Sequence, residues 1–162
     1  DNTQGSVYAV NNLGVTVTGA ITNTGFIAAQ GNSSIAANSL SSSSTSVLGA
    51  GIKADGTLAN SGDLKITTTQ ALNANGQNLA AGSTTLNGSS VNLSGSQTGG
   101  ANIGITATAG DVNTSGATVA TSGTVGTLHI TAKATTMITI SLPVMVAPLP
   151  HKSIGVDGNS CG

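Results

Sequence analysis

The sequence predicts an all-β protein built as a parallel β-helix, a solenoid of coils about 20 residues long. The first observation is a recurring phrase of glycine, a small polar residue and alternating aliphatic residues, which ends at Ile66, Leu86, Ile105 and Ile130. These positions follow one another at intervals of 20, 19 and 25 (86 − 66, 105 − 86 and 130 − 105). A period near 20 with one short strand in each copy is typical of a solenoid.

Composition is the second observation. Charged residues make up 6% of the 162 residues, against about 25% in ordinary domains, and the aromatic residues are Tyr8 and Phe26 alone. A compact globule needs bulky side chains for its core, whereas a coil needs only one or two small aliphatic residues pointing inward from each strand. The composition therefore favours a stack of coils.

Disorder is the rival interpretation, because glycine, serine and asparagine are abundant and serine crowds the run 39–46. Disordered chains usually combine low hydrophobicity with high net charge. Here the hydrophobic content is 38%, the net charge is −1, and the aliphatic residues alternate with polar ones. This alternation favours strands over disorder.

In the first half of the chain, residues 13–18 alternate as a strand does and residues 26–31 form the next short strand and turn. Residues 21–25 are predicted to be a turn, and residues 58–62 repeat their pattern of aliphatic, small, asparagine, small and glycine. Asparagine and glycine tolerate the backbone of a tight corner. The run 39–46 is predicted to be a loop that bulges from the stack.

In the second half, Asn75-Gly76 precedes a strand at 78–82, and residues 91–95 and 112–116 lie between the main phrases. Each coil is therefore expected to hold two or three strands of about 3–5 residues, within the usual strand length, joined by Gly/Asn/Ser corners. No window carries the apolar stripe of a helix. The side chains expected to point inward are Leu64, Ile66, Leu86, Val91, Leu93, Ile103, Ile105, Leu128 and Ile130.

The end of the chain, residues 134–162, breaks the pattern. All three prolines, both methionines and the single cysteine, Cys161, lie there. We expect two domains: β-helix repeats over 1–133, and a tail over 134–162 that is either a cap or a non-native end. The single cysteine excludes an internal disulfide. The start at Asp1, with repeats already running, suggests an internal piece of a longer protein.

Three segments carry a family resemblance: residues 21–31, 58–66 and 78–86. Each resembles a repeat unit of the filamentous haemagglutinin family, and the likeness covers roughly residues 10–133. The family comprises large exoproteins of two-partner secretion in Gram-negative bacteria, including adhesins and contact-dependent inhibition proteins. The resemblance implies a right-handed parallel β-helix, export through an outer-membrane β-barrel partner, and surface display or secretion. It also implies a host or bacterial cell-surface receptor or glycan as a binding partner.

Catalysis is weakly supported. The chain has five acidic residues, all aspartates, and no arginine. A cluster of Asp55, Asp63 and Asp111 in one groove would indicate a carbohydrate-active β-helix enzyme, because general acid–base catalysis needs paired or perturbed carboxylates. The preferred interpretation is that each aspartate caps a corner by bonding its own backbone. We therefore expect no catalytic residue and no enzyme.

Metals, cofactors and nucleic acid are not expected either. His129 lies between two inward aliphatic residues and should face outward, and His151 stands alone in the tail, so neither is a metal ligand. Gly99-Gly100 lacks the aspartate of a calcium-binding repeat. The net charge of −1 gives no electrostatic footprint for nucleic acid.

Threonine pairs raise the question of ice binding, which needs one pair in each coil. They begin at Thr16, Thr22, Thr67 and Thr106, so their spacings are 6, 45 and 39 (22 − 16, 67 − 22 and 106 − 67). These spacings argue against a strict register, and threonine is a common outward residue on strands.

The sequence thus predicts a structural and adhesive repeat segment of a secreted or surface-bound haemagglutinin-like exoprotein. It would act as a rigid shaft that forms or presents a cell-binding surface, with a role in virulence. One alternative is the shaft of a contact-dependent inhibition protein that delivers a toxin. The other is a carbohydrate-active β-helix enzyme.

Overall fold

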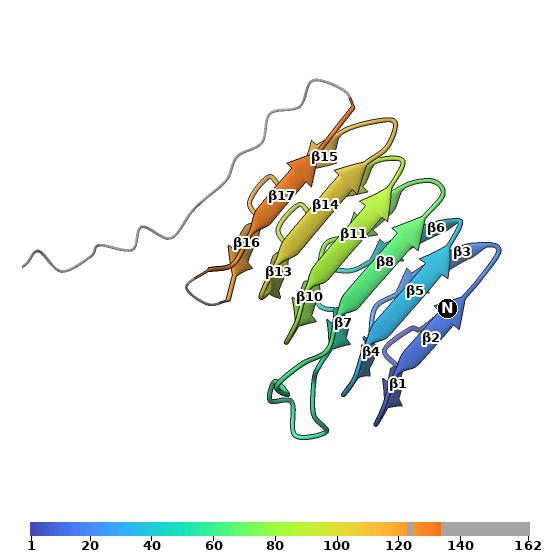
Figure 1. Cartoon of the computed structure of the whole chain (residues 1–162). Coiled ribbons are helices and arrows are strands. Elements are labelled where there is room, and N and C mark those ends of the chain that lie inside the picture. Colours follow the sequence, from blue (N-terminus) through green and yellow to red (C-terminus); the bar gives the residue numbers. More distant parts are fainter. Residues whose placement is uncertain (123–124, 134–162) are drawn as a thin grey trace, which may run out of the picture.

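The computed structural model describes residues 1–122 and 125–133, and these residues form a parallel β-helix (Figure 1). Three parallel sheets run along the stack. Sheet 1 holds β1 (Ser6–Ala9), β4 (Phe26–Ala29), β7 (Val47–Ala50), β10 (Gln77–Ala80), β13 (Gln97–Gly100) and β16 (Thr118–Thr121). Sheet 2 holds β2 (Leu13–Thr16), β5 (Ser33–Ala37), β8 (Leu64–Thr68), β11 (Thr84–Gly88), β14 (Ile103–Ala107) and β17 (Leu128–Thr131). Sheet 3 holds β3 (Ala20–Asn23), β6 (Ser39–Ser42), β9 (Leu72–Ala74), β12 (Val91–Asn92) and β15 (Val112–Asn113).

The chain visits sheets 1, 2 and 3 in turn, so each full coil contributes one strand to each sheet. The recurring phrase of the sequence becomes sheet 2. There Ile66 aligns with Leu86, Leu86 with Ile105, and Ile105 with Ile130. The predicted solenoid and its period are therefore confirmed. Of the two or three strands expected in each coil, the structure has three.

The core is a column of aliphatic side chains that runs inside the three sheets. Seven of the predicted inward residues are at most 2% exposed: Leu64, Ile66, Leu86, Val91, Leu93, Ile103 and Ile105. Leu128 and Ile130 also contact this core but are only partly buried, on the last strand that the structure describes. Burying such a side chain contributes about 1.5–3 kcal/mol, so short strands suffice when every coil repeats the contact.

Two predictions in the first half of the chain are wrong. Residues 39–42 are strand β6 of sheet 3, where Leu40 is 1% and Ser42 is 3% exposed, instead of a bulging loop. Ser42 lies in one inward row with Asn23 and Ala74 of the neighbouring coils, and Asn23 is also fully buried, so this row accepts polar side chains of different size. Residues 20–23 are also a strand, β3, and only Thr24 and Gly25 lie outside strands between β3 and β4.

The largest departure from the period lies in the third coil, between β7 and β8, where Ile35 and Ile66 align although 31 residues separate them (66 − 35). Residues 52–61 form a hairpin, with the Lys53 backbone N–H donating to the Thr57 carbonyl at 2.8 Å and an antiparallel bridge between Ile52 and Leu58. Residues 58–61 are thus part of this insertion and Gly62 closes it, so 58–62 is not a corner equivalent to 21–25. Figure 1 shows the insertion as a teal loop that projects from the otherwise regular stack.

Residues 134–162 lie outside the described residues. The tail, with its prolines, Cys161 and His151, and the domain boundary at 133/134 therefore stay predictions. No helix in the described part of the chain is long and apolar enough to span a membrane.

Candidate functional site

The recurring phrase begins with glycine and a polar residue, as in Gly62-Asp63 and Gly82-Ser83. These pairs lie at the corner from sheet 1 to sheet 2, where hydrogen bonds join one coil to the next. Asn12 Oδ1 accepts from the Asn32 backbone N–H at 2.9 Å, and Asn32 Oδ1 accepts from the Asp63 N–H at 2.9 Å. Asp63 Oδ1 accepts in turn from the Ser83 N–H at 2.7 Å. We call this series the corner ladder. It gives backbone N–H groups at the turns a partner in the neighbouring coil.

The glycine of the pair makes room for the ladder. A Cβ atom at Gly82 would clash with Asp63 Oδ1, which comes from the preceding coil. The Gly-polar spacing is therefore set by contact with the neighbouring coil. The expectation that Asp63 bonds its own backbone is wrong, because its carboxylate bonds Ser83 instead.

The three aspartates of the enzyme alternative lie apart in the fold. Asp63 is at the corner from sheet 1 to sheet 2, Asp111 precedes β15 at the corner from sheet 2 to sheet 3, and Asp55 is in the insertion. Within the described residues, no group of three or more His, Cys, Asp or Glu residues could hold a metal ion. His129 is exposed, as predicted, and its Nε2 lies 3.0 Å from Thr131 Oγ1.

Three of the four threonine pairs begin in the same row of sheet 2, although their spacing in the sequence is irregular. On the outer face of sheet 2, Thr16 aligns with Ala36, Ala36 with Thr67, Thr67 with Asn87, and Asn87 with Thr106. The insertion in the third coil distorts the sequence spacing without disturbing this register. Alanine and asparagine interrupt the row, so a continuous threonine ladder does not form.

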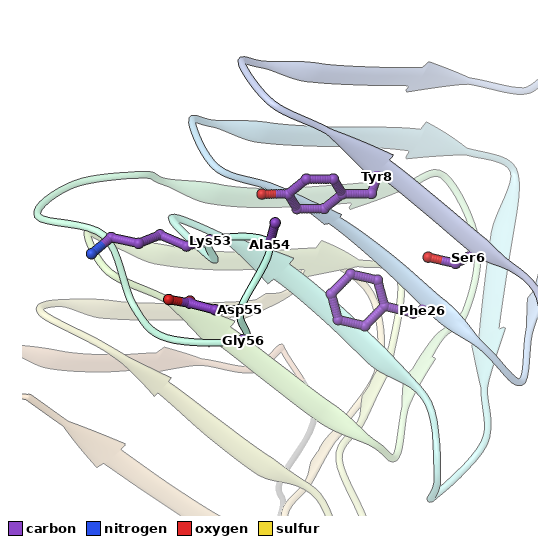
Figure 2. Close-up of a pocket in the computed structure, with 7 residues that line it drawn as sticks. All are labelled: Ser6, Tyr8, Phe26, Lys53, Ala54, Asp55 and Gly56. Atoms are coloured by element: carbon purple, nitrogen blue, oxygen red, sulfur yellow. The ribbon is translucent and has the colours of Figure 1, made fainter.

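A concave site lies on the outer face of sheet 1, beside the insertion (Figure 2). It is a hollow of about 480 Å³ lined by Ser6, Tyr8, Phe26, Lys53, Ala54, Asp55 and Gly56. The first three residues come from β1 and β4, and the other four come from the hairpin. Figure 2 shows the hairpin arching beside the two aromatic rings.

Tyr8 and Phe26 meet because of the register of the first two coils. Ser6 aligns with Phe26 and Tyr8 aligns with Ala28, which makes the two aromatic residues diagonal neighbours on the outer face. Their ring centroids are 6.4 Å apart with planes tilted by 39°. This pairing was not predicted from the sequence, although the separation of the two aromatic residues by nearly one coil was the available signal.

The hairpin is tied to this face. Tyr8 OH donates to the Ile52 carbonyl at 3.0 Å. Ile52 itself is 4% exposed and covers Gly49, where a Cβ atom would clash with Ile52 Cδ1. The small outward residues Ala28 and Gly49 of sheet 1 therefore form the seat on which the insertion rests.

Asp55 supplies the negative charge of the hollow. The Thr57 hydroxyl and backbone N–H donate to Asp55 Oδ1 at 2.6 and 2.9 Å. These hydrogen bonds, the hydroxyl first, hold the pKa of the Asp55 carboxyl below its ordinary value. Together with one lysine, Lys53, the hollow carries no net charge.

Fold and site together define a segment of a parallel β-helix with a hollow beside its hairpin insertion. Two known proteins contain similar segments. The chain is 56% identical over 100 residues to "Toxin CdiA" of Yersinia pestis, a match that covers 62% of this chain. It is 50% identical over 90 residues, or 55% of the chain, to "tRNA nuclease CdiA-2" of Burkholderia pseudomallei (strain 1026b). No model of a protein family matches the chain. No solved structure matches it either.

The match spans 3% of the length of each of these two relatives. One name reads toxin, the other reads tRNA nuclease, and both are CdiA proteins, which favours the contact-dependent inhibition type over the general haemagglutinin repeat of the family resemblance. The nuclease activity in one name belongs to a protein of which this chain matches only a small part. The absence of enzymatic activity in the present segment therefore stays a prediction.

Proposed function

We propose that this chain is a length of the shaft of an exported contact-dependent inhibition protein, displayed at the surface of a Gram-negative bacterium. Identity of 50–56% to segments of the two CdiA proteins supports this over an adhesin, the function that the sequence favoured. The toxic activity would lie elsewhere in the parent protein. Its export partner would be an outer-membrane β-barrel.

The mechanism is mechanical reach. Each added coil lengthens the stack by about 4.8 Å, the spacing of hydrogen-bonded strands, and buries its own aliphatic residues against the coil before it. Length therefore increases without a larger core, as in other repeat proteins. The low content of charged and bulky residues suits a chain that crosses the outer membrane unfolded and folds outside.

Deletions in the parent protein test this role. Removing residues 77–96 takes out one whole coil and joins Gly76 to Gln97, which occupies the register position of Gln77. We expect toxin delivery to target cells in mixed culture to stay within about twofold, because the stack closes again after the loss of a complete repeat. Removing residues 77–86 deletes half a coil, breaks the register, and should abolish surface display.

Immunolabelling of intact cells measures display, and counts of surviving target cells measure delivery. Equal loss of both after the two deletions would overturn the shaft proposal, because a spacer tolerates a whole-coil deletion. Normal display with no delivery after the whole-coil deletion would instead identify this segment as the receptor-binding part. A host or bacterial cell-surface receptor or glycan would then be its partner.

A further inference from the structure

We propose that the hollow beside Tyr8 and Phe26 binds one neutral pyranose ring of a cell-surface glycan. This inference goes beyond the proposed shaft function, because a spacer needs no pocket. It assigns a ligand class and a set of contacting residues to one face of the stack.

The aromatic residues carry the first step. The chain has one tyrosine and one phenylalanine, and the fold brings both to the same outer face. Both side chains are only partly buried there. Aromatic rings present a flat apolar surface, on which the C–H face of a sugar ring can stack while its hydroxyls remain available for hydrogen bonds.

The polar groups carry the second step. Asp55 accepts hydrogen bonds, Lys53 donates them, and the Ser6 hydroxyl can do either. All three residues line the hollow; in Figure 2 the Ser6 hydroxyl is directed toward the rings, whereas the Asp55 and Lys53 side chains extend from the hairpin away from them. One positive and one negative charge suit a neutral polyhydroxyl ligand, whereas a sulfated or otherwise polyanionic glycan would meet Asp55 with only one lysine to offset it.

The geometry is held in place before any ligand arrives. Tyr8 is fixed by its bond to the Ile52 carbonyl, and Asp55 is fixed by its two bonds to Thr57. Ile52 anchors the hairpin on Gly49. Preorganised groups lose little conformational entropy on binding, so a shallow site can still select one ligand class.

Size argues against a larger partner, and the pairing of β4 on both sides leaves a peptide strand only the outer edge of β1, away from the hairpin. A hollow of about 480 Å³ lies in the range of small-ligand sites, about 300–1,000 Å³. The two strands of sheet 1 under the hollow, β1 and β4, pair with each other, and β4 pairs with β7 on its other side. A peptide that lies across this face would therefore find no unpaired backbone of β4 with which to form a strand pair.

The test is saturation-transfer difference NMR on the whole chain with the methyl glycosides of glucose, galactose, mannose and N-acetylglucosamine. We expect transfer to the ring protons of at least one sugar, with a Kd in the millimolar range. Phe26→Leu keeps apolar volume but removes a stacking surface, and Asp55→Asn removes the charge. Each should weaken binding about tenfold, in line with the size of an aromatic or charge-assisted contact.

Gln97→Ala is the matched control. Gln97 occupies the same outward row of sheet 1 as Phe26, through Val47 and Gln77, but lies three strands away from it. We expect this variant to bind like the wild type. Deletion of residues 52–61 removes one wall of the hollow and should abolish transfer, while far-UV circular dichroism and a cooperative urea transition show that the stack remains folded.

The source of the sugar is distinguished by two further ligands, a purified bacterial outer-membrane polysaccharide and a desialylated mammalian glycopeptide. If one of these two ligands displaces the methyl glycoside that binds most tightly, it identifies the source of the natural glycan as bacterial or mammalian. Absence of transfer from all four monosaccharides would overturn the proposal, and so would transfer that Phe26→Leu, Asp55→Asn and the deletion leave unchanged. The whole-coil deletion described above tests the shaft independently, since residues 77–96 include none of the residues that line the hollow.

Discussion

Two corners of the same stack, one in the second coil and one in the third, join sheet 1 to sheet 2 in very different lengths of chain. In the second coil residues 30–32 connect β4 to β5, and in the third coil residues 51–63 connect β7 to β8. Yet the corner ladder passes through both, because Asn32 Oδ1 accepts from the Asp63 N–H as Asn12 Oδ1 accepts from the Asn32 N–H.

The long corner is therefore a short corner with a hairpin added on the outside. The two ends of the hairpin meet at a neck, where a Cβ atom on Gly62 would clash with the Gly51 backbone and where the Gly62 φ of 145° suits glycine alone. Closing a loop of this length costs little free energy beyond that of a short one. A solenoid can thus acquire a pocket at one corner while its core and register stay unchanged.

The largest expected effect is the difference in unfolding free energy between a substitution in the core and one in the hairpin. Leu86→Ala should lower the free energy of unfolding by about 2–5 kcal/mol, because Leu86 is fully buried and its loss leaves a cavity. Leu58→Ala, in the hairpin and 51% exposed, should change it by less than about 0.5 kcal/mol. Urea unfolding followed by circular dichroism measures both, and similar losses would show that the hairpin is part of the core.

The neck of the hairpin comes next. Gly62→Ala should cost about 1–3 kcal/mol, because the added methyl group overpacks the contact with Gly51 and the backbone conformation disfavours a side chain. Gly104→Ala is the control, since a Cβ atom there meets nothing within 4 Å. If the two substitutions had the same effect in urea unfolding, the neck would not constrain the insertion.

The corner ladder should contribute equally at the short and the long corner. Asn32→Ala and Asp63→Ala each remove one acceptor of a backbone N–H and should each cost about 0.5–1.5 kcal/mol. Asp63→Asn keeps the acceptor and should be close to neutral. A much larger loss for Asp63→Ala than for Asn32→Ala would mean that the long corner depends on its ladder bond more than the short one.

The smallest effect concerns the charge at the hairpin tip. The hydrogen bonds from Thr57 lower the pKa of the Asp55 carboxyl, so they stabilise the fold when that carboxyl is ionised. This stabilisation is fully present above the ordinary pKa of an aspartate and is lost as the pH falls through the lowered pKa. Carboxyl carbon NMR should show Asp55 titrating below the ordinary range, and Thr57→Val should raise its midpoint by removing the hydroxyl donor. An unchanged midpoint in this variant would exclude the hydroxyl as the cause.

Much of the fold could be predicted from local pattern. Leu64, Ile66 and Leu86 were predicted to face inward because they alternate with polar residues and repeat after one coil, and all three are buried. The serine run 39–46 predicts a loop, but residues 39–42 form β6, because composition does not say which serines face the interior. Ser42 lies inward, in the row that Asn23 and Ala74 occupy in the neighbouring coils, and this row is set by the register between coils.

The pocket could not be predicted in the same way. Tyr8, Phe26 and Asp55 belong to three different coils, and the segment that brings Asp55 to the rings breaks the very period that predicts the rest. The sequence alone predicts that Asp63 caps its own corner. Its carboxylate instead accepts from the Ser83 N–H, and that donor comes near only when the coils stack.

By itself the sequence determined the class of fold, the coil length and the inward residues, because each depends on spacing along the chain and on the side chain's own chemistry. Only the tertiary structure decided which corner carries an insertion, where that insertion rests, and which side chains meet on the outer face. Those outcomes depend on the register between coils, and a single added hairpin changes the sequence distance between neighbours without changing their distance in space.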